Sequence, residues 1–148
     1  MAEVYQQAFA ASSSSCADQL PPAARLGIQW MNRGDFFTAH EALEDAWRAE
    51  PGPVRRLYQG ILQAAVACYH LERGNFAGAR KLLTSAANYL RDFPGGCQNV
   101  DVDQLLRDLA RLETALTLLE SGETAGLDRT IFPCVHFCAP HPSQANTA

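Results

Sequence analysis

The chain has 148 residues, of which 47% are apolar and 19% charged, and its formal net charge is −4. This length suits one globular domain with a core of its own. The acidic balance argues against a nucleic-acid partner, which needs a basic surface. The longest nearly unbroken apolar run, residues 64–68, is far too short to span a membrane.

Residues 1–19 are small and polar, with a serine run at residues 12–15. We interpret them as a flexible lead-in with a short helical turn around residues 4–9. They lack the basic start and the apolar block of a secretory signal. The five cysteines of the chain form an odd set without the pattern of a small disulfide scaffold. The prediction is therefore a cytoplasmic location, where thiols stay reduced.

The apolar residues that follow recur at intervals of three and four, which predicts amphipathic helices separated by turns rich in Gly and Pro. A first helix opens at Pro21 and Pro22 and ends at the turn 32–35. Four more helices are expected over residues 36–49, 54–72, 76–91 and 102–120. We therefore expect one helical domain over residues 20–122 and an irregular tail over residues 123–148.

The turns contain an internal repeat. Residues 33–36 (RGDF) return almost unchanged as residues 73–76 (RGNF), 40 positions later. Each copy joins two helices, which looks like the hairpin of tetratricopeptide repeats, although the spacing exceeds the roughly 34 residues of that family. Two copies are too few for a solenoid. We therefore predict an all-α fold, a compact bundle of about five helices in which the last helix covers the second hairpin.

Ionisable side chains gather on the second and third of these helices. His40, Glu41 and Glu44 lie within one turn of each other on the second helix, and Trp47 continues the same face. The third helix carries Arg56, Gln59, Gln63 and His70 at steps of 3, 4 and 7 along one face. Antiparallel packing of the two helices would bring these side chains into a shared gap.

Two interpretations of this cluster stay open. In the first, His40, Glu44 and His70 bind a divalent metal such as zinc, iron or manganese, and Glu41 acts as a base on bound water. The HExxE pattern lacks the second histidine of the zinc-protease motif. In the second, His40 and Glu44 form a structural hydrogen-bond network with Arg56 and Gln59 that locks the two helices together, and Glu41 is solvated. Trp47 then serves as a core aromatic.

The tail carries four further potential metal ligands within eight residues, namely Cys134, His136, Cys138 and His141. This spacing is too cramped for the usual zinc geometry, and neighbouring prolines stiffen it. We interpret these residues as incidental members of an irregular tail.

Residues 32–47 (NRGDFFTAHEALEDAW) resemble the signature of family three hundred and nine of the domains of unknown function. The matching residues are Asn32, Gly34, Phe36, Phe37, Ala39, His40, Glu41, Leu43, Glu44 and Trp47, and the resemblance extends over about residues 22–92. It implies a small all-helical protein, and some family members carry the label of predicted metal-dependent hydrolase. It makes the polar side chains of the two helices the best candidates for a site, namely His40, Glu41, Glu44, Arg56, Gln59, Gln63 and His70.

These patterns favour a non-enzymatic binding module whose partner is a protein or a small molecule. The alternative is a metal-dependent hydrolase with His40, Glu44 and His70 as ligands. The sequence leaves open whether the chain forms a homo-oligomer.

Overall fold

The computed structural model describes residues 13–122 and 129–138. Its α-helices in that part are α2 (Pro22–Asn32), α3 (Phe36–Ala49), α4 (Arg55–Glu72), α5 (Phe76–Leu90) and α6 (Val102–Glu120), followed by a short 3₁₀ helix, η1 (Arg129–Ile131). The five long helices confirm the predicted all-α fold. The helical turn predicted around residues 4–9 lies outside the described residues.

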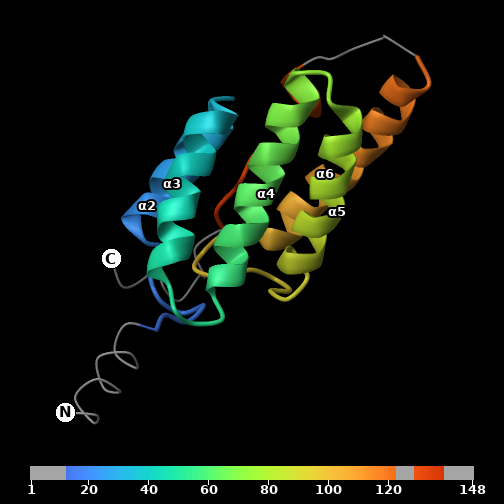
Figure 1. Cartoon of the computed structure of the whole chain (residues 1–148). Coiled ribbons are helices and arrows are strands. Elements are labelled where there is room, and N and C mark those ends of the chain that lie inside the picture. The colour runs from blue at the N-terminus through green and yellow to red at the C-terminus, as the bar shows by residue number, and fades with distance from the viewer. Residues whose placement is uncertain (1–12, 123–128, 139–148) are drawn as a thin grey trace, which may run out of the picture.

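The helices pack in chain order, each against the next, so the bundle consists of two consecutive hairpins and a last helix. In Figure 1, α2 and α3 form one hairpin, α4 and α5 form the next, and α6 lies against α5. The inward faces form one continuous core that includes Leu43, Ile61 and Leu105, each fully buried. This arrangement confirms the compact bundle predicted from the two hairpins.

The repeated sequence at residues 33–36 and 73–76 builds the same helix-helix turn twice. Gly34 and Gly74 adopt positive φ angles of 86° and 76°, which glycine reaches without steric cost. The next residue then caps the following helix. Asp35 accepts a hydrogen bond from the Thr38 amide at 3.2 Å, and Asn75 accepts one from the Gly78 amide at 3.0 Å. The internal repeat is therefore a repeated local structure.

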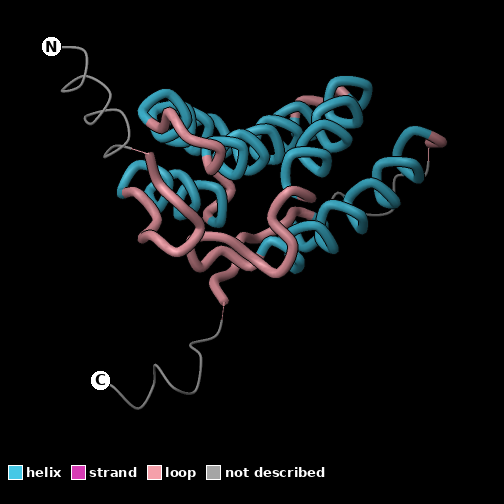
Figure 2. Tube along the Cα trace, turned by 90° about the horizontal axis from the view of Figure 1, so that it is seen from below, coloured by secondary structure: helices cyan, strands magenta, loops and turns pink. Residues whose placement is uncertain are grey.

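Three segments meet at the end of the molecule where α3 turns into α4. Glu50, only 5% exposed, accepts hydrogen bonds from the Gly52 amide at 2.8 Å and the Ser14 amide at 3.1 Å. A disulfide joins Cys16 to Cys97. Figure 1 shows residues 13–20, the α3–α4 turn and the α5–α6 loop side by side at this end, and Figure 2 shows the same loops from below.

A buried hydrogen bond adds to these links. The Tyr58 hydroxyl donates to Gln98 Oε1 at 2.6 Å, and both side chains are almost fully buried. Burial raises the pKa of Tyr58 to about 12, so the hydroxyl stays protonated as a donor at neutral pH. The Gln98 side chain also donates to the Ser15 carbonyl at 3.1 Å. These contacts fix the α5–α6 loop against α4.

The disulfide bears on the predicted location. Cys16 and Cys97 are separated by 81 residues, so no local spacing announces their pairing. Disulfides persist mainly in oxidising compartments. The Cys16–Cys97 disulfide therefore does not support a reducing environment for this protein. The cytoplasmic location therefore stays a prediction. Among the described helices, none is both long and apolar enough to cross a membrane.

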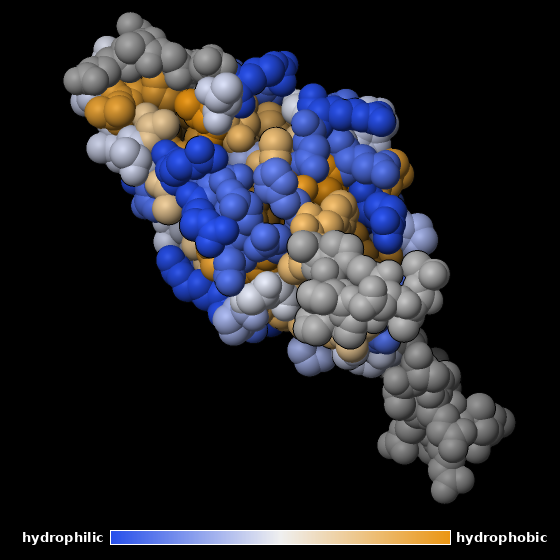
Figure 3. All heavy atoms as spheres, turned by 180° about the vertical axis from the view of Figure 1, so that it is seen from behind, coloured by the Kyte–Doolittle hydropathy of each residue, from blue (hydrophilic) through white to orange (hydrophobic). Residues whose placement is uncertain are grey.

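The C-terminal segment 129–138 packs on the bundle. It passes between the α2–α3 hairpin and the later helices (Figure 1), and its Val135 is only 2% exposed. The sequence predicted an irregular tail here, without this packing. On the face opposite to that of Figure 1, hydrophilic side chains separate smaller hydrophobic areas (Figure 3).

The close approach of α4 and α5 depends on Gly60. A Cβ atom at this position would lie 2.8 Å from the side chain of Leu90, which is fully buried and cannot swing away. We expect Gly60→Ala to lower the free energy of unfolding by about 1–2 kcal/mol, because overpacking outweighs the gain in helix propensity. Urea denaturation measures the difference, and a variant as stable as the parent would contradict this packing.

Stability should fall in acid through Glu50. Its burial raises the pKa, but the hydrogen bonds from the Ser14 and Gly52 amides outweigh burial and lower the pKa below 4.5, the ordinary value for a glutamate. The folded state is therefore stabilised above that value, and the stabilisation is lost as pH falls through the lower folded pKa. We expect Glu50→Gln to cost about 1–3 kcal/mol at pH 7.

The difference between the parent and Glu50→Gln should shrink as pH falls below 4.5, the ordinary pKa of a glutamate, and through the lower folded pKa. Urea denaturation of both proteins at pH 7, 5 and 3 measures this difference in the free energy of unfolding. A constant difference across this range would show that the carboxylate charge at Glu50 contributes nothing.

Candidate functional site

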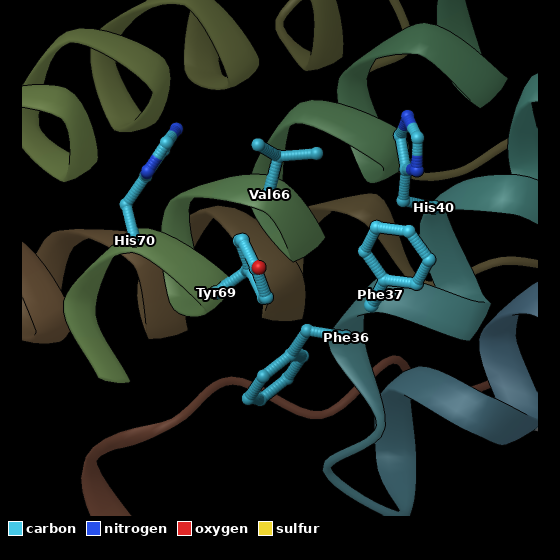
Figure 4. A pocket seen from close by; sticks show the side chains of 6 residues that line it. All are labelled: Phe36, Phe37, His40, Val66, Tyr69 and His70. Atoms are coloured by element: carbon cyan, nitrogen blue, oxygen red, sulfur yellow. The ribbon is translucent and has the colours of Figure 1, made fainter. Parts of the chain in front are cut away.

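A small apolar pocket lies between α3 and α4 at the ends that carry the signature residues. It encloses about 120 Å³ and is lined by Phe36, Phe37 and His40 from α3 and by Val66, Tyr69 and His70 from α4 (Figure 4). The two helices run antiparallel, so the first turns of α3 face the last turns of α4. This packing brings both predicted histidines to one pocket.

Aromatic rings form most of the pocket wall. The Phe37 ring lies 5.9 Å from the Tyr69 ring across the helix pair, and it also lies 5.9 Å from the His40 ring on its own helix. The Tyr69 and His70 rings are 6.1 Å apart. Phe37 is 54% exposed although it is a large apolar side chain. The rim of the pocket is thus an aromatic surface open to solvent.

The two histidines occupy opposite sides of the pocket. Figure 4 shows Val66 between them, with the imidazole rings not directed at each other. Nε2 of His40 lies 3.1 Å from a carboxylate oxygen of Glu44, whose other oxygen contacts Arg48. Nδ1 of His70 lies 3.2 Å from Nδ2 of Asn75. Each imidazole therefore has its own polar partner.

The predicted metal ligands do not converge. Among residues 13–122 and 129–138, no three His, Cys, Asp or Glu side chains lie together as a metal-binding group. His40 pairs with Glu44, but His70 lies across the pocket. Glu41 is exposed, because one step along a helix turns a side chain by about 100° away from its neighbour. Of the four potential ligands in the tail, His141 lies outside the described residues.

The other predicted polar residues belong to separate contacts. Arg56 pairs with Asp92 at 2.6 Å and lies over the Tyr89 ring, so it faces α5. The guanidinium of Arg55 lies over the Trp47 ring, with its Cζ 4.5 Å from the ring centroid. Within the described part of the chain, buried atoms of Trp47 (Nε1), Arg55 (Nε) and Gln63 (Oε1) have no hydrogen-bond partner. Gln59 is half-buried on α4. The structure thus contains separate pairs, where one of the two interpretations of the sequence expected a closed network.

Several contributors to the pocket were given no role from the sequence. Phe37 is part of the signature at residues 32–47, and no pattern in the sequence marks Tyr69, Val66 or Asn75 as part of a site. A signal existed for Phe37, because it precedes His40 by three positions and a second bulky aromatic residue, Phe36, already faces the core. Nothing in the local sequence announces the pairing of Phe37 with Tyr69 across two helices.

Comparison with known proteins finds a family model that matches the part of the chain containing this site. Residues 24–82 match the family described as Domain of unknown function (DUF309). The matched range contains α3 and α4 and all six residues that line the pocket.

Two curated relatives carry no functional description in their names. "Uncharacterized protein YpuF" of Bacillus subtilis is 34% identical over 99 residues, which is 66% of this chain and 54% of that protein. An "Uncharacterized protein" of Aquifex aeolicus is 27% identical over 101 residues, or 68% of this chain and 29% of that protein. The matched stretches therefore cover about half or less of these relatives. No solved structure matches the chain significantly.

The polar contacts of the site should contribute little to stability. The side chains of His40 and Glu44 are 32% and 29% exposed, and contacts between such partly solvated groups are weak. We expect Glu44→Gln and His70→Gln each to change the free energy of unfolding by less than about 1 kcal/mol. A loss of about 3 kcal/mol or more in urea denaturation would instead indicate a buried, locked network.

Proposed function

We propose that this chain is a protein-interaction module whose α3–α4 pocket receives one apolar side chain of a partner protein. The observation that carries the proposal is the exposure of Phe37, 54%, at the rim of an apolar pocket. An exposed aromatic side chain beside a concave apolar surface is typical of a protein contact.

The size of the pocket supports a side chain over a cofactor or a metabolite. Its volume is about 120 Å³, whereas pockets for drug-sized ligands measure roughly 300–1,000 Å³. A branched aliphatic side chain such as leucine suits the pocket.

The chemistry of the rim supports a peptide backbone beside that side chain. His40 uses Nε2 toward Glu44, and His70 uses Nδ1 toward Asn75. The opposite nitrogen of each ring is therefore left to contact a partner, as donor or acceptor according to its tautomer. One ring nitrogen stands on each side of the apolar pocket. A ligand with an apolar side chain between two amide groups offers a hydrogen-bonding partner for each nitrogen.

The metal-dependent hydrolase has weaker support. Catalytic zinc sites generally use three protein ligands and one open position. The described residues offer His40 and Glu44 together, and His70 stands apart across Val66. The binding module therefore remains the better-supported function.

N-acetyl-leucine amide is a direct probe, because it combines the leucine side chain with two amide groups. We expect saturable shifts of the His40 and His70 ring resonances in NMR titrations, with a Kd in the millimolar range. That affinity follows from about twelve non-hydrogen atoms at about 0.3 kcal/mol each.

Val66→Phe, which fills the pocket, should abolish these shifts. Leu118→Ala is the matched control, because Leu118 is also apolar and 49% exposed but lies on α6. Absent shifts, or shifts unchanged by Val66→Phe, would contradict the proposal. Elemental analysis of the same samples tests the rival function, since about one equivalent of metal that is lost in His40→Ala would favour the hydrolase.

A further inference from the structure

The C-terminal segment 129–138 is held on the bundle through its main chain. Asn32 Nδ2 donates to the Val135 carbonyl at 2.9 Å, and the Val135 amide donates to Asn32 Oδ1 at 2.8 Å. One side-chain amide thus satisfies both backbone groups of one residue of an extended segment. These partners are 103 residues apart in the sequence. Asn32 therefore acts as a clamp on a peptide backbone.

Further backbone contacts hold the neighbouring residues of the segment. The Cys134 amide donates at 3.3 Å to Asp108, a carboxylate on α6 that is 3% exposed. Beyond Val135, the His136 carbonyl accepts from the Asp101 amide at 2.8 Å, and the Cys138 amide donates to the Asn99 carbonyl at 2.8 Å. Four residues in this short stretch are thus bound through main-chain atoms, which every peptide possesses.

Two side chains anchor the segment between these contacts. The Phe132 ring lies 5.1 Å from the ring of Phe36, whose side chain is 2% exposed. Three positions later, Val135 is also buried. The receiving groove has one wall on the α2–α3 hairpin, with Asn32 and Phe36, and another on α6, with Asp108. Figure 1 shows the segment descending between these two parts of the molecule.

One wall of the groove, on the α2–α3 hairpin, differs from the occupant in its relation to the family model, whereas the α6 wall with Asp108 lies outside the match. Asn32 and Phe36 lie within residues 24–82, the range that matches the family, whereas segment 129–138 lies outside it. The clamp thus belongs to the part of the chain shared with the family, and its present ligand does not.

We propose that this groove is a peptide-binding site, which the chain fills with its own residues 129–138 and which an extended segment of a partner protein can occupy instead. The partner segment carries an aromatic residue three positions before a β-branched aliphatic residue, as Phe132 and Val135 do here. Asn32 binds the backbone of the aliphatic residue. This site is separate from the α3–α4 pocket, although Phe36 contributes to both.

The test uses the full chain and a labelled peptide with the sequence of residues 129–138, in which serine replaces both cysteines. In the double variant Phe132→Ala/Val135→Ala the internal segment is weakened. We expect this variant to bind the peptide saturably in fluorescence anisotropy, at least tenfold more tightly than the unaltered chain, whose own segment competes. Adding Asn32→Ala should weaken binding at least tenfold, and a peptide with alanine at the two anchor positions should not bind.

Two results would overturn the proposal. One is a folded double variant, judged by circular dichroism, that does not bind the peptide or binds it equally well without Asn32. The other comes from hydrogen exchange of the unaltered chain, which does not depend on the folding of any variant. The Val135 amide should exchange at least tenfold faster than amides in the centre of α4. Exchange of Val135 only through global unfolding would make the segment a permanent part of the core.

Discussion

The antiparallel packing of α3 on α4 determines where the signature side chains of this chain lie. The turn between the two helices is closed by Glu50, whose carboxylate accepts hydrogen bonds from Gly52 and from Ser14. With that turn fixed, the first turns of α3 meet the last turns of α4, and Phe37 comes to lie against Tyr69. The pocket and its exposed rim follow from this one contact.

The same packing gives the signature two roles. Phe36, Ala39 and Leu43 point into the core, so these residues of the pattern build the fold. Phe37 and His40 stand on the neighbouring stripe of α3 and reach the surface of the pocket. The His40 imidazole is therefore only partly buried. Its burial costs little free energy, so it needs neither a metal nor a closed hydrogen-bond network to be tolerated.

Local signals in the sequence were sufficient for the helices. The positive φ of Gly34 and Gly74 and the capping side chain of Asp35 act within one turn of the chain, so the predicted helix ends lie close to the observed ones. The predicted all-α bundle followed from the same signals, because each turn joins helices that can only bury their apolar faces against each other.

The arrangement of the site depended on contacts that no local pattern encodes. Spacing placed His40 and His70 on facing helices, but the rotation of each helix about its axis decided that Val66 stands between them. Arg56 was assigned to the predicted cluster and instead pairs with Asp92 on the far side of α4.

The longest-range contacts were also missed. The sequence pattern places Asn32 in a turn, but its side chain binds the backbone of Val135, which is 103 residues away in the sequence. The sequence pattern also did not predict the disulfide between Cys16 and Cys97. Such contacts form only in the completed fold, so a sequence pattern confined to one or two helices cannot predict them.

The most direct test of this account is a nuclear Overhauser measurement between ring protons in the unaltered chain. The packing of α3 on α4 predicts a cross-peak between the rings of Phe37 and Tyr69, and none between the imidazoles of His40 and His70. A strong cross-peak between the two imidazoles would place both rings at one point. It would return the histidines to a shared centre and contradict the arrangement described for this pocket.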